Sequence, residues 1–203
     1  HVLESVIEPK PPKPKAPNKD GKISEPDKPP SKDIIVKLRV TTSTGTMDSK
    51  PKEFKTILLA YDKKRDLALL RIESSEIMPF VASVAPRDVQ LQPFRKTWAM
   101  GAPLGIGPIP TEGVLGIQHE IIGGEEFNLS TTPIFSGNSG GGLYHYSSER
   151  HQFEMIGIVE AMGLSVGGPV PHTALCMPLP RLYDFLEEHQ FGNERGGGEQ
   201  EAR

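Results

Sequence analysis

Short runs of β-forming residues, separated by turn signals at intervals of roughly ten residues, dominate the chain from about residue 33 onward. Strand and helix patterns do not alternate, and only residues 180–188 show the apolar spacing of a helix. The pattern predicts an all-β barrel or sandwich that ends in one helix, and it disfavours a doubly wound α/β fold. The expected strands are residues 34–40, 54–61, 67–72, 97–101, 111–122, 126–132, 141–146, 153–162 and 173–179.

Two segments lack the composition of a folded domain. Residues 8–32 are rich in proline and lysine and nearly devoid of apolar side chains, so burial cannot offset the entropy cost of ordering them. We expect a disordered insertion there, and a disordered Gly/Glu-rich tail at residues 191–203. The expected folded domain therefore comprises residues 1–7 and 33–190.

Charge and cysteine content narrow the function classes. A net charge of −3 over 203 residues gives no electrostatic reason to expect a nucleic-acid partner. No apolar run reaches the length of about 18 residues that indicates a membrane-spanning helix. The lone Cys176 excludes an intrachain disulfide, and its apolar neighbours predict a buried structural thiol rather than a nucleophile. Because the chain opens at His1, we expect it to be a fragment, with any targeting segment upstream.

The most informative motif surrounds Ser139, in the run FSGNSGGGL at residues 135–143. Acyl transfer by a serine needs a hydroxyl exposed on a tight turn, with backbone N–H groups aimed at the developing oxyanion. Glycines on both sides of the serine allow backbone conformations that side chains would forbid. The alternative interpretation is a Gly/Ser turn without chemistry.

Two further residues complete a candidate triad. Asp66 stands at the start of the predicted strand 67–72, where an acid can orient an imidazole. It could equally be a turn residue that caps the strand, and Asp62 is the competing acid. His1 becomes a candidate base because the order His, Asp, Ser matches a known triad order. The remaining histidines are weaker candidates, expected on the surface or in loops: His119, His145, His151, His172 and His189.

These motifs, taken together and in order, resemble the chymotrypsin-fold serine peptidases and specifically their HtrA (DegP-like) branch. Residues 137–141 match its GNSGG motif, residues 66–70 its DLALL motif, and residues 1–2 the end of its TNxHV motif. WAMGAPLG at residues 98–105, followed by TEGVL at 111–115, resembles a further conserved-looking segment of that branch. Several motifs in the right order make chance agreement improbable.

The resemblance implies two antiparallel six-stranded-type β-barrels, the first of them incomplete, and a short C-terminal helix. It implies a serine endopeptidase in which His1 is the general base, Asp66 the orienting acid and Ser139 the nucleophile. The backbone N–H groups of Gly137 and Ser139 would form the oxyanion hole. It also implies polypeptide substrates, with no metal and no organic cofactor. By the same resemblance the protein could form oligomers, and its location would be the cell envelope or outside the cell.

By the same resemblance, residues 133–136 and 160–162 wall the primary specificity pocket. The substrate-binding side chains would be those of Ile134, Glu160, Ala161 and Met162. Pro133 falls where trypsin-like enzymes keep an aspartate, so a buried Lys or Arg would find no partner and cleavage after small or medium aliphatic residues is predicted. Glu160 could reverse this preference, unless the alternation of strand neighbours turns its side chain away.

A rival from another class is a catalytically inactive protease-like binding or scaffold domain. The presence of both Asp66 and Ser139 argues against it. Asn138 stands where digestive enzymes carry an aspartate that pairs with a newly cut N-terminus, so activation of that kind is not expected.

Overall fold

The computed structural model describes residues 34–38, 52–75, 81–105, 108–165 and 168–191. These residues form β-strands and one α-helix, so the predicted all-β class is confirmed. The chain divides into two compact units, His1–Ile77 and Met78–Arg203, and each is described by itself. The predicted insertion at residues 8–32 and, apart from Phe191, the predicted tail at residues 191–203 lie outside the described residues.

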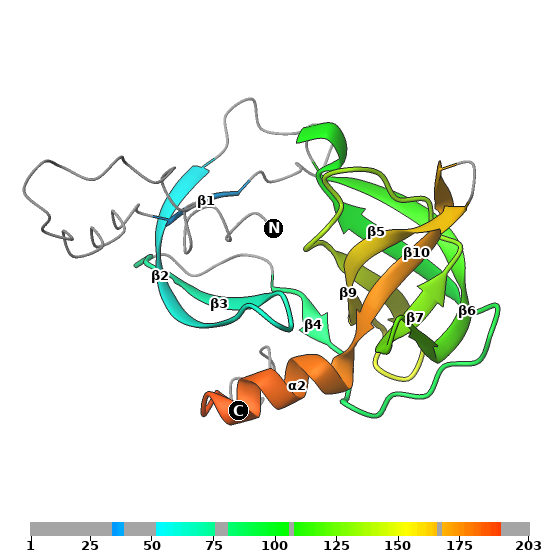
Figure 1. Ribbon diagram of the computed structural model, residues 1–203. Helices are drawn as coiled ribbons and strands as arrows, with labels where there is room; N and C mark the ends of the chain where they lie inside the picture. Colours follow the sequence, from blue (N-terminus) through cyan, green and yellow to red (C-terminus); the bar gives the residue numbers. More distant parts are fainter. Residues whose placement is uncertain (1–33, 39–51, 76–80, 106–107, 166–167, 192–203) are drawn as a thin grey trace, which may run out of the picture. The chain divides into compact units, whose positions relative to one another are not determined.

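The first unit contains an antiparallel sheet of three strands in the order β1-β2-β3 (Figure 1). The strands are β1 (Ile34–Leu38), β2 (Lys52–Asp62) and β3 (Leu67–Ile72). Phe54, Ala60 and Leu67 are its buried apolar residues. All three strands were predicted, with bounds that differ by at most two residues at either end.

The second unit contains the other strands and the helix (Figure 1). In chain order they are β4 (Ser83–Val84), β5 (Lys96–Gly101), the 3-10 turn η1 (Pro103–Gly105), β6 (Ile109–Ile122), β7 (Glu125–Ser130), β8 (Gly142–Ser147), β9 (Gln152–Ser165), β10 (Gly168–Pro178) and α2 (Leu179–Glu188).

Six strands of this unit close into a ring. Their order is β10-β7-β6-β5-β8-β9, and β9 pairs again with β10, while β4 adds to β9 as a parallel edge strand. Every pairing within the ring is antiparallel. A closed ring leaves no exposed sheet edge, which is the usual way in which a barrel avoids edge-to-edge association.

The hairpin predicted between residues 111–122 and 126–132 is confirmed as β6–β7. Ile122 pairs with Glu125, so the loop is the two residues Gly123 and Gly124, whose φ angles are +63° and +87°. Two consecutive positive φ angles are typical of a type I′ turn, which glycine adopts without steric cost.

The barrel interior is packed with small and branched side chains. Its core comprises Ala85, Ala99, Ile134, Leu143, Ile156, Val159, Ala174, Cys176, Leu179 and Tyr183. The last two belong to α2, and the Tyr183 hydroxyl donates to the backbone oxygen of Ala85 at 2.8 Å. The helix thereby joins the end of β10 to the segment that carries β4.

No helix among the described residues is both long and apolar enough to cross a membrane.

Candidate active site

Ser139 lies on a tight loop between β7 and β8, and glycine holds this loop in shape. The Asn138 N–H donates to the Phe135 oxygen at 3.0 Å, and Gly137, the third residue of this turn, has a φ of +99°. A positive φ at that place is typical of a type II turn. A Cβ on Gly137 would lie 2.5 Å from the Ala102 oxygen, so glycine is required by space as well as by conformation.

The turn fixes the direction of the Gly137 N–H. The Ser136 oxygen accepts a hydrogen bond from the Leu104 N–H at 2.8 Å. Because the peptide bond between Ser136 and Gly137 is trans, the Gly137 N–H points to the opposite side, away from Leu104. Neither this N–H nor that of Ser139 has an acceptor within the described part of the chain.

Hydrogen bonds pin the loop to the neighbouring strand β9. Gly140 N–H donates to the Val159 oxygen and Val159 N–H donates to the Gly141 oxygen, each at 2.8 Å. The exposed Ser139 hydroxyl donates to the backbone oxygen of Glu160 at 3.0 Å. A backbone carbonyl holds the hydroxyl in place but is too weak a base to remove its proton.

Asn138 is buried beneath the serine, with a relative exposure of 1%. Its Oδ1 accepts from the Phe135 N–H at 3.4 Å, and its Nδ2 has no hydrogen-bond partner among the described residues. Gly101 packs directly against it, since a Cβ there would lie 2.9 Å from the Asn138 Cα. The buried Asn138 side chain therefore stabilises the turn through the hydrogen bond that its Oδ1 accepts.

Asp66 lies in the first unit, in the turn between β2 and β3, and is exposed with a φ of 55°. Asp62 is committed to the same turn. Its Oδ1 accepts from the N–H groups of Lys64 and Arg65 at 2.8 and 3.1 Å, and its Oδ2 accepts from the Arg65 guanidinium at 3.1 Å. His1 lies outside the described residues.

Among the residues predicted to bind substrate, two contact the barrel core. Ile134 is 2% exposed and belongs to the core, and Met162 packs against the same cluster. Ala161 is exposed. Glu160 is mostly buried, and its carboxylate lies 3.7 Å from the Arg181 guanidinium.

Strand β9, which carries Glu160, Ala161 and Met162, contains a β-bulge that the sequence did not predict. Leu175 pairs with Ala161 whereas Cys176 pairs with Val159, so Glu160 is the extra residue of a β-bulge. A bulge resets the alternation of side chains. Val159 and Met162 consequently both contact the core, although three positions separate them.

One sequence expectation is wrong for His145. It was expected in a loop or on the surface, but it is 4% exposed and pairs in register with Glu154, which is 1% exposed. The His145 Nε2 lies 3.5 Å from Glu154 Oε2, and desolvation lowers the pKa of the imidazole, against the opposing effect of Glu154. The inward positions of β8, Leu143, His145 and Ser147, could have indicated this burial.

The expectation for Cys176 is confirmed. The thiol is fully buried, and burial, followed by the negative charge of Glu160, raises its pKa far above the ordinary range. A thiolate nucleophile at this position is therefore disfavoured.

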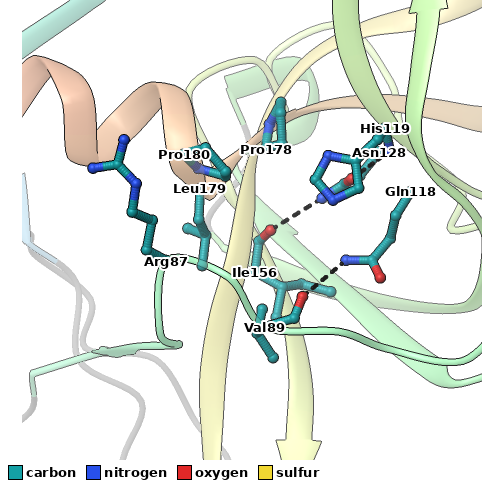
Figure 2. A pocket seen from close by; sticks show the side chains of 9 residues that line it. All are labelled: Arg87, Val89, Gln118, His119, Asn128, Ile156, Pro178, Leu179 and Pro180. Atoms are coloured by element: carbon teal, nitrogen blue, oxygen red, sulfur yellow. Dashed lines mark hydrogen bonds between the residues drawn. The ribbon is translucent and has the colours of Figure 1, made fainter.

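Figure 2 shows a small pocket at the start of α2, separate from the serine loop. Asn128 Nδ2 donates to the Ile156 oxygen at 3.4 Å, and Gln118 Nε2 donates to the Val89 oxygen at 3.3 Å. These two side-chain amides thus bond backbone oxygens of the lining, and none of the predicted site residues lines the pocket. No group of three or more metal-ligating side chains occurs among the described residues.

Two of three comparisons with known proteins find chains that are similar to this one. No family model matches the chain. One curated protein, "Probable periplasmic serine protease do/HhoA-like" of Haemophilus influenzae, is 26% identical over 152 residues, which is 72% of this chain and 31% of that protein.

Two solved structures share the fold. One is the HtrA-type protease AlgW with a decapeptide, with a TM-score of 0.58 and 24% identity over 77% of this chain. The other is an AlgW variant with a tripeptide, with a TM-score of 0.57 and 22% identity over 78% of this chain. This chain spans 45% and 49% of the two solved chains, so it corresponds to less than half of each.

The closed antiparallel barrel therefore has the all-β, chymotrypsin-like fold of these HtrA-type structures. In sequence the chain is similar to a protein described as do/HhoA-like, and in fold to HtrA-type structures, which agrees with the resemblance that its motifs predicted.

Proposed function

We propose that this chain is the catalytic part of a serine endopeptidase that acts through an acyl-enzyme. The observation that carries the proposal is the Ser139 loop, where an exposed hydroxyl lies beside two backbone N–H groups, those of Gly137 and Ser139, that lack acceptors within the described residues. Preorganised donors of this kind stabilise a developing oxyanion. The similarity to HtrA-type proteases supports the same reaction class.

In the proposed mechanism Ser139 Oγ attacks the carbonyl carbon of the scissile bond while His1 accepts the hydroxyl proton. The carbonyl oxygen becomes an oxyanion, bound by the Gly137 and Ser139 N–H groups. Collapse of this intermediate expels the amine, which takes the proton from His1, and water then hydrolyses the acyl-enzyme. No step needs a metal or an organic cofactor.

Asp66 is the proposed orienting acid, because it opens the DLALL run that resembles the HtrA motif, whereas the carboxylate of Asp62 holds its own turn. An acid in this role fixes the tautomer of the imidazole and stabilises the imidazolium. The proposed triad is therefore His1, Asp66 and Ser139.

We propose cleavage after small or medium aliphatic residues such as Val, Ala, Ile or Leu. Ile134 and Met162 would provide an apolar boundary for the pocket, since both already pack on the same core, and Pro133 contributes no charge. A buried Lys or Arg of the substrate would then lack a counter-ion, which costs far more than a methylene contact returns. The partners would be polypeptides, in line with the peptides bound to AlgW, and the location would be the cell envelope, in line with the periplasmic Haemophilus relative.

Turnover of a peptide library tests this proposal. Ser139→Ala should lower kcat by about 10⁶-fold, whereas Ser136→Ala, at an exposed serine on the same turn, should leave it nearly unchanged. Retained turnover in Ser139→Ala would contradict the assignment of the nucleophile. A dominant preference for Lys or Arg at the cleaved bond would contradict the pocket.

A further inference from the structure

Arg181, in the first turn of α2, lies between two carboxylates. Its Nη1 is 3.7 Å from Glu160 Oε1 and its Nη2 is 3.5 Å from Glu125 Oε2. The side chains of Arg181 and Glu160 are only 17% and 20% exposed, whereas that of Glu125 is 56% exposed. Water screens the pair with Glu160 less, so this pair is the stronger of the two.

The Arg181 side chain is more buried than is usual for an arginine in a surface ion pair. Nη1 is buried and has no hydrogen-bond partner among the described residues, so its compensation comes from the nearby Glu160 charge. Removing one member of a buried pair leaves an uncompensated charge, which is strongly unfavourable. Arg181 and Glu160 should therefore act as a unit.

Glu160 is also the bulged residue of β9. At a bulge, strand alternation no longer decides to which side a side chain points. The contacts of the side chain decide it instead, and the ion pair with Arg181 on α2 is one of these contacts. The Glu160 charge also contributes, after burial, to the raised pKa of Cys176 on β10. This contribution agrees with a Glu160 carboxylate that lies toward β10 and α2.

We propose that Arg181 is a specificity-determining positioning residue that holds the Glu160 carboxylate against α2 and keeps the substrate pocket free of an acid. The same ion pair steadies the bulge whose backbone oxygen accepts the Ser139 hydroxyl. This inference rests on the proposed endopeptidase function, because the pocket that it protects is the one proposed there.

The test compares the full chain with Arg181→Lys, Arg181→Gln and the double variant Arg181→Gln/Glu160→Gln. The readout is the ratio of kcat/KM for two peptides that differ only in Lys or Val at the cleaved bond. Arg181→Gln should raise the Lys-to-Val ratio by about tenfold, because the Glu160 carboxylate loses the guanidinium that competes with a substrate cation for it. Arg181→Lys should keep the original ratio, and the double variant should return to it.

An unchanged ratio in Arg181→Gln would overturn the specificity role, even if that variant were less stable. A double-mutant cycle on thermal unfolding tests the ion pair without any turnover. Non-additive losses for Arg181→Gln and Glu160→Gln are expected, and additive losses would overturn the pair. Failure of the proposed function is distinguishable, because it would abolish peptide cleavage in every variant while leaving the coupling in the unfolding cycle intact.

Discussion

The hydroxyl of Ser139 donates to the backbone oxygen of Glu160 at 3.0 Å, which ties the proposed nucleophile to the bulge in β9. Gly140 and Gly141, which follow the serine, bond the same strand through Val159. The position of the hydroxyl is thus set by strand β9 as much as by its own loop, and changes in either segment should alter reactivity.

Gly137→Ala should be damaging in two separable ways. A left-handed residue with a side chain costs about 1–2 kcal/mol of stability. The new methyl group would also meet the Ala102 oxygen at 2.5 Å and displace the Gly137 N–H, so kcat should fall by about 10²-fold or more. Thermal unfolding and peptide turnover measure the two effects.

Gly124→Ala is the matched control for that variant. Gly124 has a φ of +87°, but nothing lies within 4 Å of a Cβ placed there, so a similar loss of stability should leave kcat unchanged. A normal kcat in Gly137→Ala would show that the Gly137 N–H is not needed for catalysis.

Asn138→Asp should destabilise the domain at neutral pH. The side chain is 1% exposed, and no cation contacts it among the described residues, so a carboxylate there should cost about 2 kcal/mol or more. The cost should shrink as the pH falls and the new acid is protonated. Chemical denaturation at several pH values measures this, with Asn138→Ala as a variant whose loss should not depend on pH. A pH-independent loss in Asn138→Asp would contradict the expectation.

His145 should make the domain less stable in acid. Burial lowers the pKa of its imidazole below the value of 6.5 that applies when the chain is unfolded, even though Glu154 acts in the opposite direction and Arg95 and Arg150 act with burial. The unfolded chain therefore binds the proton more readily. The contribution to stability is present above pH 6.5 and is lost as the pH falls below it, at up to about 1.4 kcal/mol per pH unit.

Replacement of this histidine isolates its contribution. In His145→Gln the free energy of unfolding should vary less between pH 7 and pH 5 than in the unaltered chain, as measured by denaturant titration. An identical pH dependence in both proteins would show that other groups control acid stability.

The helix and all strands except β4 were predictable because each depends on a local pattern. The apolar run LALLRI and the Gly123-Gly124 pair identified β3 and the β6–β7 turn, and Leu182 and Phe185 identified α2. Closure of the barrel by the pairing of β9 with β10 depends on residues far apart in the chain, and no local pattern expresses it. Strand β4 has two residues, too few for any period to be visible.

The site was predictable to the extent that glycine and serine spacing specify a turn. The Ser139 loop follows from its glycines, but the bulge at Glu160 does not, because it arises from the register of β9 against β10. The ion pair with Arg181 follows from the place of α2 after β10, which tertiary packing determines. Burial of His145 opposite Glu154 requires knowledge of which strands are neighbours.

Labelling with a fluorophosphonate probe, followed by mass spectrometry of the modified peptide, tests most directly whether Ser139 is an activated nucleophile. Such a probe reacts with a serine whose hydroxyl is activated, and ordinary surface serines do not react. We expect one modification, on Ser139, that is retained in Ser136→Ala and absent in Ser139→Ala. An unlabelled chain, or a label on another residue, would contradict the proposed endopeptidase.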